Sequence, residues 1–146
     1  MDDLALETFD DGIDELTDAI HAGFDAIPLP EDVEPYRSTP FAFALRNEQG
    51  RIEGGVTGHS VWGWLYVHYL WVAETRRRGG HGKRLLQVAE SEAERRGCHG
   101  VWLHTISFQA PAFYEHMGYR RCGGLDDFPK GHQRIFYQKR LIPDPG

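Results

Sequence analysis

Several features that define other protein classes are scarce in this sequence of 146 residues. It has two cysteines, Cys98 and Cys122, too few for a disulfide framework and without the spacing of a metal site. It has no apolar run of the roughly 20 residues that a membrane-spanning helix needs. Met1 is followed by two aspartates instead of a basic leader. We therefore expect one cytoplasmic domain over residues 1–146, with no membrane partner and with both thiols reduced and buried.

Basic residues are missing from the first 36 positions, which carry twelve Asp and Glu side chains. Because the formal net charge of the whole chain is -6, the remaining positions are net positive. This asymmetry has two interpretations: a helix with a solvated acidic face, or an electrostatic field that attracts a cationic amine. The sequence leaves both open.

Hydrophobic periodicity predicts a domain that mixes strands and helices. A short strand over 3–9 precedes a helix with apolar residues at helical spacing, capped by Asp10 or Asp11. Residues 28–40 hold four prolines and are predicted to be a loop with a short helical piece. This order predicts an α/β (α+β) domain with a central mixed sheet. The later elements are three antiparallel strands between residues 41 and 72, a helix over 82–96, a strand over 101–106, a helix over 109–117, and strands near 119–123 and 134–141.

The two later helices carry their own end signals. Gly97 follows the helix over 82–96, and Gly118 follows the helix over 109–117. Ser107 is the candidate N-cap of the second helix, since its hydroxyl can accept a hydrogen bond from a free backbone N–H group.

The most distinctive stretch is RRRGGHGKRL, residues 76–85, which directly follows an apolar strand. Its glycines lie where that strand runs into a helix, so several backbone N–H groups point at one spot near the positive end of the helix dipole. Glycine allows a ligand to approach closely, while Arg77, Arg78 and Lys83 add charge-assisted hydrogen bonds. The stretch therefore predicts a diphosphate-binding site.

Two common phosphate-binding loops do not match the sequence of residues 76–85. A P-loop needs glycine at position 77 and Ser or Thr at position 84, but arginine stands at both. A dinucleotide-binding fingerprint needs a third glycine where Leu85 stands. A nucleic-acid patch is disfavoured because the chain is acidic overall and has no second basic stripe. We predict no nucleic-acid partner.

Two spaced motifs resemble those of the GNAT superfamily of acyl-CoA-dependent N-acyltransferases. The first, R-x-x-G-x-G, is met by Arg77, Gly80 and Gly82. One predicted helix and one predicted strand separate it from the second motif, as in the superfamily. The second motif is A-x-x-x-Y-E-x-x-G-F. Its residues in this chain are Ala110, Tyr114, Glu115, Gly118 and Tyr119, so tyrosine replaces the final phenylalanine.

The resemblance implies a GNAT-like fold, with a mostly antiparallel sheet of about six or seven strands and about four flanking helices. In that fold the fourth and fifth strands splay apart, and acetyl-CoA lies between them with its diphosphate on the glycine-rich turn. The resemblance thus implies an acetyl-CoA-dependent N-acetyltransferase, a transferase of the acyltransferase class. The residues that it assigns to the coenzyme are Leu70, Trp71, Val72, Arg77, Arg78, Gly79, Gly80, His81, Gly82, Lys83, Ser107, Ala110 and Phe113.

Acyl transfer from a thioester to an amine needs a proton for the leaving thiolate and a neutral attacking nitrogen. By the resemblance Tyr114 is the general acid, although a tyrosine here can also simply pack in the core. The fourth strand often carries the base in this superfamily, which makes His68 the candidate, with His59, His104 or water as alternatives. Ser107 stands where superfamily members often carry asparagine.

The expected function is transfer of an acetyl group from acetyl-CoA to a primary amine of a small molecule, by direct attack in a ternary complex. The N-terminal helix, the proline-rich loop and the loop before the last strand are expected to bind this acceptor. A non-catalytic acyl-CoA-binding module, and acetylation of a protein lysine or N-terminus, stay open as alternatives. No metal is predicted, because no histidine forms an i, i+4 pair with an acidic companion. The resemblance leaves a homodimer open.

Overall fold

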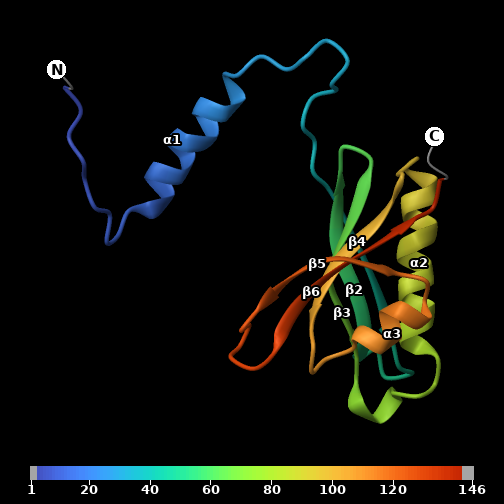
Figure 1. Cartoon of the computed structure of the whole chain (residues 1–146). Helices are drawn as coiled ribbons and strands as arrows, with labels where there is room; N and C mark the ends of the chain where they lie inside the picture. The colour runs from blue at the N-terminus through green and yellow to red at the C-terminus, as the bar shows by residue number, and fades with distance from the viewer. Residues whose placement is uncertain (1–2, 143–146) are drawn as a thin grey trace. The chain divides into compact units, whose positions relative to one another are not determined.

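The computed structural model describes residues 3–142, so the ends of the expected domain, residues 1–2 and 143–146, lie outside the described residues. The chain divides into two units at Pro35, and α1 lies in the first unit and the sheet in the second (Figure 1). The expectation of a single domain stays a prediction. Every element of the candidate site belongs to the second unit.

The first unit contains the predicted N-terminal helix, α1 (Ile13–Asp25). Residues 3–9 form no strand, contrary to prediction, and the described part of this unit offers no second strand for them to pair with. The predicted cap at Asp10 or Asp11 is also wrong: Gly12 is the N-cap, at φ 67°, and no side chain caps the helix. The proline-rich loop contains a turn instead of a short helix.

The second unit is built on a six-stranded sheet. The strands are β1 (Thr39–Arg46), β2 (Ile52–Val61), β3 (Trp64–Val72), β4 (Gly100–Ile106), β5 (Arg120–Asp126) and β6 (Gln133–Arg140). Their order in the sheet is β1-β2-β3-β4-β6-β5. All neighbours are antiparallel except β3 and β4, which run parallel. The predicted mixed, mostly antiparallel sheet is confirmed.

Helices α2 (His81–Arg95) and α3 (Pro111–His116) pack on this sheet. The leucines and alanines of α2 are buried in one core with strand residues such as Leu65 and Leu103, and Tyr114 of α3 joins them. This burial follows the apolar stripe that predicted α2. The described residues form three α-helices, α1, α2 and α3, where about four were expected.

Glycines end both later helices as predicted: Gly97, at φ 73°, follows α2, and Gly118, at φ 91°, follows α3. The predicted cap of α3 is wrong, because the helix begins after Ala110 and no side chain caps it. The hydroxyl of Ser107 instead accepts the N–H of Gln133 at 3.0 Å, which joins the end of β4 to the start of β6.

Both cysteines are free, as predicted. Cys98 is buried in the core, but Cys122 is exposed, so its predicted burial is wrong. Cys122 lies on β5, an edge strand in which every residue is exposed. An edge strand with neither face covered gives a small apolar residue nothing to pack against.

The parallel strands β3 and β4 stay paired over three residue pairs, from Trp64 with Gly100 to Tyr66 with Trp102. Beyond these pairs the strands diverge, while each keeps its antiparallel partner on the other side. Because the expected strand over 3–9 does not form, β3 and β4 are the fourth and fifth strands of the predicted order. The predicted splay between them is confirmed.

A β-bulge bends β3 at this point. In the ladder with β2, the partners of Thr57 and Gly58 skip His68, which is the extra residue of the bulge. A bulge bends and twists the strand that carries it, which turns β3 away from β4 where their pairing stops. Gly58 fits the bend closely, since a Cβ at this position would lie 1.8 Å from the carbonyl oxygen of Tyr66.

We expect Gly58→Ala to lower the free energy of unfolding by about 2–4 kcal/mol, because the added Cβ meets rigid backbone. Gly55→Ala in the same strand is the control, since its Cβ would lie 3.4 Å from the carbonyl oxygen of Phe43, an ordinary contact. Chemical denaturation measures both variants. Equal stability of the two would contradict the close fit at Gly58.

Candidate active site

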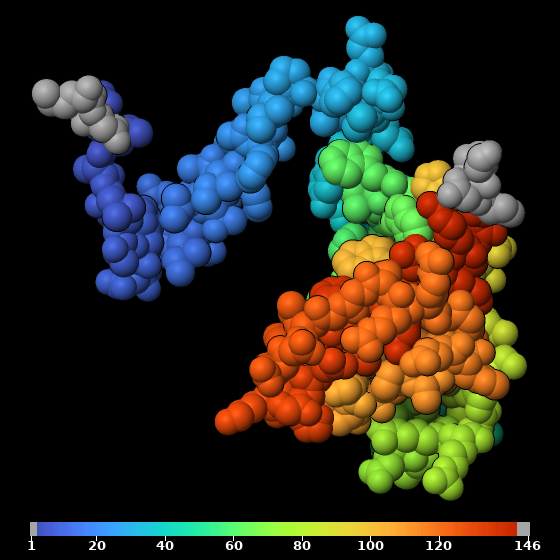
Figure 2. All heavy atoms as spheres, in the orientation of Figure 1, coloured from blue at the N-terminus to red at the C-terminus, as the bar shows by residue number. Residues whose placement is uncertain are grey.

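A cavity of about 840 Å³ lies where β3 and β4 diverge. In Figure 2 the chain around residues 70–80 and the chain around 105–117 lie at the same end of the second unit. The cavity brings together both predicted catalytic residues and most of the predicted coenzyme residues, whose roles stay predictions. Those on its wall are His68, Leu70, Trp71, Val72, Arg77, Arg78, Gly80, His81, Gly82, Lys83, Ala110, Phe113 and Tyr114.

Two predicted coenzyme residues do not line this cavity. Gly79 lies against His81, because a Cβ on it would be 3.0 Å from the imidazole ring. Ser107 uses its hydroxyl to accept the N–H of Gln133. Motif spacing places a residue along the chain, but it does not determine which way the side chain points.

Six further residues reach the wall, among them His104, which the sequence offered only as an alternative base. Most come from the end of β4 and the segment before α3, the region that also holds Ser107 and precedes the second motif. Of the alternative bases, His104 lies on the wall and His59 does not. The additional wall residues are Tyr69, Arg76, His104, Thr105, Phe108 and Gln109.

The turn between β3 and α2 exposes backbone N–H groups. It follows a short 3-10 helix, η1 (Glu74–Arg76), and both Arg78 and Gly80 adopt left-handed φ angles, 68° and 79°. Gly80 is the N-cap of α2 and no side chain caps this helix, so its first N–H groups are available to a ligand. Arg77 Nε donates to the carbonyl of Val72 at 3.2 Å, which holds the turn against the end of β3. The turn is therefore a cationic cradle for an anion.

The second half of β3 offers its backbone to the cavity. Residues after Tyr66 pair with β2 on one side and with no residue of β4 on the other. Their remaining peptide groups face the gap, where an extended ligand can pair with them as another strand would. Leu70 and Val72 meanwhile pack on the core and keep this edge in place.

Tyr114 lies on α3 with its ring in the core and lines the cavity. Its exposed fraction is 8%, and its ring centroid lies 5.1 Å from that of Phe113 and 6.0 Å from that of Tyr119. No group among the described residues hydrogen-bonds its hydroxyl. Burial raises the pKa of this phenol above its usual value, so it is protonated at neutral pH. It can therefore donate a proton to a ligand.

Two histidines line the cavity from the two strands that diverge around it. His68, at the bulge of β3, is exposed and stacks on Tyr69 with 3.9 Å between ring centroids. His104, on β4, is half-buried, and its Nε2 lies 2.8 Å from the hydroxyl oxygen of Tyr66. Burial and then the charge of Arg134 hold the pKa of His104 below its usual value. The His104 ring is therefore mostly neutral at neutral pH.

No group of three or more His, Cys, Asp or Glu side chains in the described part of the chain is arranged to hold a metal ion. No helix between residues 3 and 142 is long and apolar enough to cross a membrane.

The cavity combines a cationic turn, an open strand edge, a protonated phenol and two imidazoles.

Comparison with known proteins identifies the family. The sequence model of the acetyltransferase (GNAT) family matches residues 9–119. The chain belongs to this family. The membership predicted from the two motifs is confirmed, and acetyl-CoA is the co-substrate that the GNAT family uses.

Relatives with known names or structures agree with the GNAT assignment. Blasticidin-S acetyltransferase of Streptomyces morookaense is 45% identical over 85 residues, which are 58% of this chain and 62% of that protein, so less than two thirds of its length is covered. The crystal structure of an acetyltransferase from Bacillus cereus ATCC 14579 matches 96% of this chain and 98% of its own, with 35% identity and a TM-score of 0.76. An aminoglycoside 6′-N-acetyltransferase complexed with coenzyme A shares the GNAT fold, with a TM-score of 0.64 at 22% identity over 73% of this chain and 76% of its own.

We expect Gly82→Val to weaken acetyl-CoA binding by at least about tenfold, because its side chain would fill the gap between the turn and α3. A Cβ on Gly82 already lies 3.7 Å from the Phe113 ring and 3.9 Å from Val72. Gln87→Val, on an exposed position of the same helix, controls for the cost of valine in α2. Calorimetric titration measures both variants, and equal affinities would contradict the role of Gly82.

Proposed function

We propose that this GNAT chain is an N-acetyltransferase that moves the acetyl group of acetyl-CoA to a primary amine of a small molecule. The observation that carries the proposal is one cavity that joins the cationic turn after β3 to Tyr114 on α3. A co-substrate with a diphosphate at one end and a thioester at the other matches both features at once. A simple phosphate ligand would account only for the turn.

In this proposal the turn binds the diphosphate of acetyl-CoA through backbone N–H groups. Arg78 and Lys83, both on the cavity wall, add positive charge next to the helix N-terminus. The open edge of β3 after Tyr66 pairs with the amide arm of the co-substrate. Its N–H groups also polarise the thioester carbonyl, so that negative charge on the carbonyl oxygen is stabilised as it develops.

The proposed chemistry is direct attack. The lone pair of the amine nitrogen forms a bond to the thioester carbon, and the bond between that carbon and sulfur then breaks. The phenolic proton of Tyr114 passes to the leaving sulfur, which becomes the thiol of CoA. Tyr114 suits this role because burial keeps its phenol protonated and no described residue competes for the hydroxyl.

A base must take the proton that the amine loses. We propose His68, because it is exposed on the cavity wall at the bulge of β3. Its ring is accessible to an acceptor that enters from solvent, whereas His104 has one ring nitrogen engaged with Tyr66. Water bound next to His68 can carry the proton without direct contact.

Charge and the relatives support the proposed acceptor class. The first 36 residues carry twelve acidic and no basic side chains, which favours a cationic amine. Relatives named for blasticidin S and for aminoglycosides support a small molecule over a protein acceptor. The cytoplasmic location and the homodimer stay predictions.

An amine panel tests the proposed function. Protein is mixed with acetyl-CoA and either aminoglycosides, blasticidin S, polyamines or lysine peptides, and the released CoA thiol is measured with a thiol-reactive dye. We expect release with at least one small amine above the hydrolysis background. Release with peptides alone would overturn the acceptor class, and acetyl-CoA binding without any release would favour the non-catalytic module.

We expect Tyr114→Phe to lower kcat about 100-fold or more, because the leaving thiolate loses its proton donor. Tyr137→Phe is the matched control: its ring packs 6.2 Å from that of Tyr114, but its hydroxyl donates to Glu115 and does not line the cavity. The control loses about 1 kcal/mol of stability and keeps its kcat. Unchanged turnover of Tyr114→Phe would remove the acid assignment.

We expect His68→Gln to lower kcat/KM for the amine about tenfold or more, because the proton acceptor is gone. His59→Gln is the control, since His59 lies outside the cavity wall. Steady-state rates over a range of amine concentrations, at saturating acetyl-CoA, measure both variants. An unchanged kcat/KM of His68→Gln would assign the base to water or to another group.

A further inference from the structure

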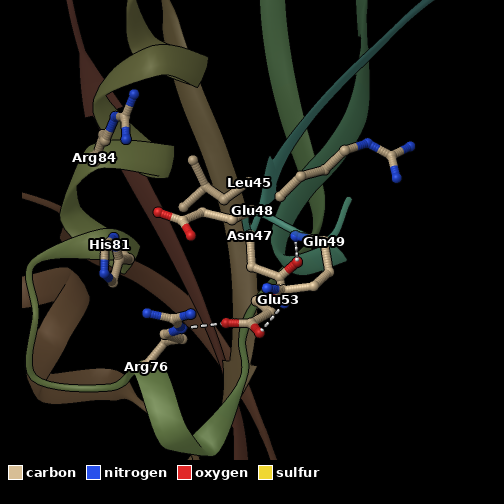
Figure 3. A pocket seen from close by; sticks show the side chains of 9 residues that line it. Leu45, Asn47, Glu48, Gln49, Glu53, Arg76, His81 and Arg84 are labelled. Carbon is tan, nitrogen blue, oxygen red and sulfur yellow. Dashed lines mark hydrogen bonds and ion pairs between the residues drawn. The ribbon is translucent and has the colours of Figure 1, made fainter. Parts of the chain in front are cut away.

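Arg76 lies between two cavities. Besides the large one, a second cavity of about 340 Å³ lies among the end of β1, the β1–β2 turn, η1 and the start of α2 (Figure 3). Arg76 is a wall residue of both cavities. Arg76 also ends η1, directly before the turn that binds the diphosphate in the proposed function. A residue that fixes the position of Arg76 therefore also fixes the position of the first residues of that turn.

Glu53 holds Arg76 from the second cavity. Its Oε2 accepts the Nε–H of Arg76, and its Oε1 accepts a hydrogen bond from Asn47 Nδ2 at 2.7 Å (Figure 3). Its backbone carbonyl accepts the N–H of Ala73 at 2.7 Å, one residue before η1. Both carboxylate oxygens thus have partners, and Glu53 contacts the segment before the turn through side chain and backbone.

Asn47 ties this contact to the rigid end of a hairpin. Its Oδ1 accepts the N–H groups of Gln49 and Arg51, each at 2.9 Å, within the β1–β2 turn. A continuous set of hydrogen bonds therefore runs from the hairpin turn through Asn47 and Glu53 to Arg76. Arg76 itself is about half exposed, at 52% for its side chain, and without Glu53 its long side chain would sample many rotamers.

We propose that Glu53 is a positioning residue for acetyl-CoA: it fixes the Arg76 guanidinium, and with it the start of the turn, for the coenzyme diphosphate. The proposal rests on the proposed function. The hydrogen bond from Arg76, and next the one from Asn47, hold the pKa of Glu53 below its usual value. The Glu53 carboxylate is therefore ionised at neutral pH and maintains its ion pair with Arg76.

The first test compares two variants of the same cavity. Glu53→Gln keeps the shape of the side chain but loses the charge that holds Arg76. Glu48→Gln makes the same charge change on the same cavity wall, where Glu48 has no hydrogen bond or ion pair with any described residue. We expect Glu53→Gln to raise the acetyl-CoA Kd and KM about fivefold with kcat unchanged, the size of one partly exposed ion pair, and Glu48→Gln to do neither.

A truncated donor separates positioning from general damage. S-acetylpantetheine lacks the diphosphate, so we expect Glu53→Gln and wild type to have the same KM for it. An equal rise for both donors, or an equal rise in Glu48→Gln, would overturn the proposal, since either marks a structural or long-range charge effect. An unchanged Kd of Glu53→Gln for acetyl-CoA would also overturn it.

A double-mutant cycle tests whether Glu53 acts through Arg76. We expect Glu53→Gln to add no further loss of acetyl-CoA affinity in an Arg76→Gln background. Additive losses would show that Glu53 acts independently and would overturn the proposal. A wild-type protein that binds no acetyl-CoA would overturn the proposed function together with this inference, whereas loss of the Glu53 effect alone leaves that function standing.

Discussion

The divergence of β3 from β4 after three residue pairs is the constraint on which the rest of the structure depends. A parallel pair that continued would satisfy both strand edges and leave no cavity between them. Pairing stops where the bulge at His68 bends β3, and Gly58 leaves room for that bend. Each strand keeps an antiparallel partner on its outer side, so the sheet remains continuous although its centre opens. The gap is thus a stable feature of the fold.

Functional groups reach this gap from both sides, each side formed by a strand and the helix that follows it. The turn from β3 into α2 supplies positive charge and free N–H groups, and helix α3, which follows β4, supplies Tyr114. A buried polar cluster holds the helices behind the gap: Tyr119, after α3, donates to Glu90 of α2 at 2.7 Å, and Lys139 of β6 lies 3.2 Å from the same carboxylate. A carboxylate shared by two partners leaves little freedom for α2 to shift relative to α3.

Elements with a repeating local pattern, the two later helices and the strands of the sheet, were predicted correctly, whereas the strand over 3–9 and the cap at Ser107 were not. The apolar stripe of α2 and the glycines after α2 and α3 are local signals, and both helices end close to the predicted residues. The strand over 3–9 has strand-like residues, but the described part of its unit offers no strand beside it. Ser107 has the chemistry of a cap, yet its hydroxyl bonds to Gln133, 26 positions away. A local pattern contains no information about such partners.

The sequence by itself determined the cationic glycine-rich turn, the second motif with Tyr114, and hence the family, because backbone conformation in a short turn depends on nearby residues such as Gly80. Only the tertiary structure decided which side chains meet in the cavity and behind it. His68 and His104 line one cavity because two strands diverge around it, and Glu53 meets Arg76 across 23 positions because β2 and β3 are paired. These contacts depend on register and strand bending, which arise from packing over the whole sheet.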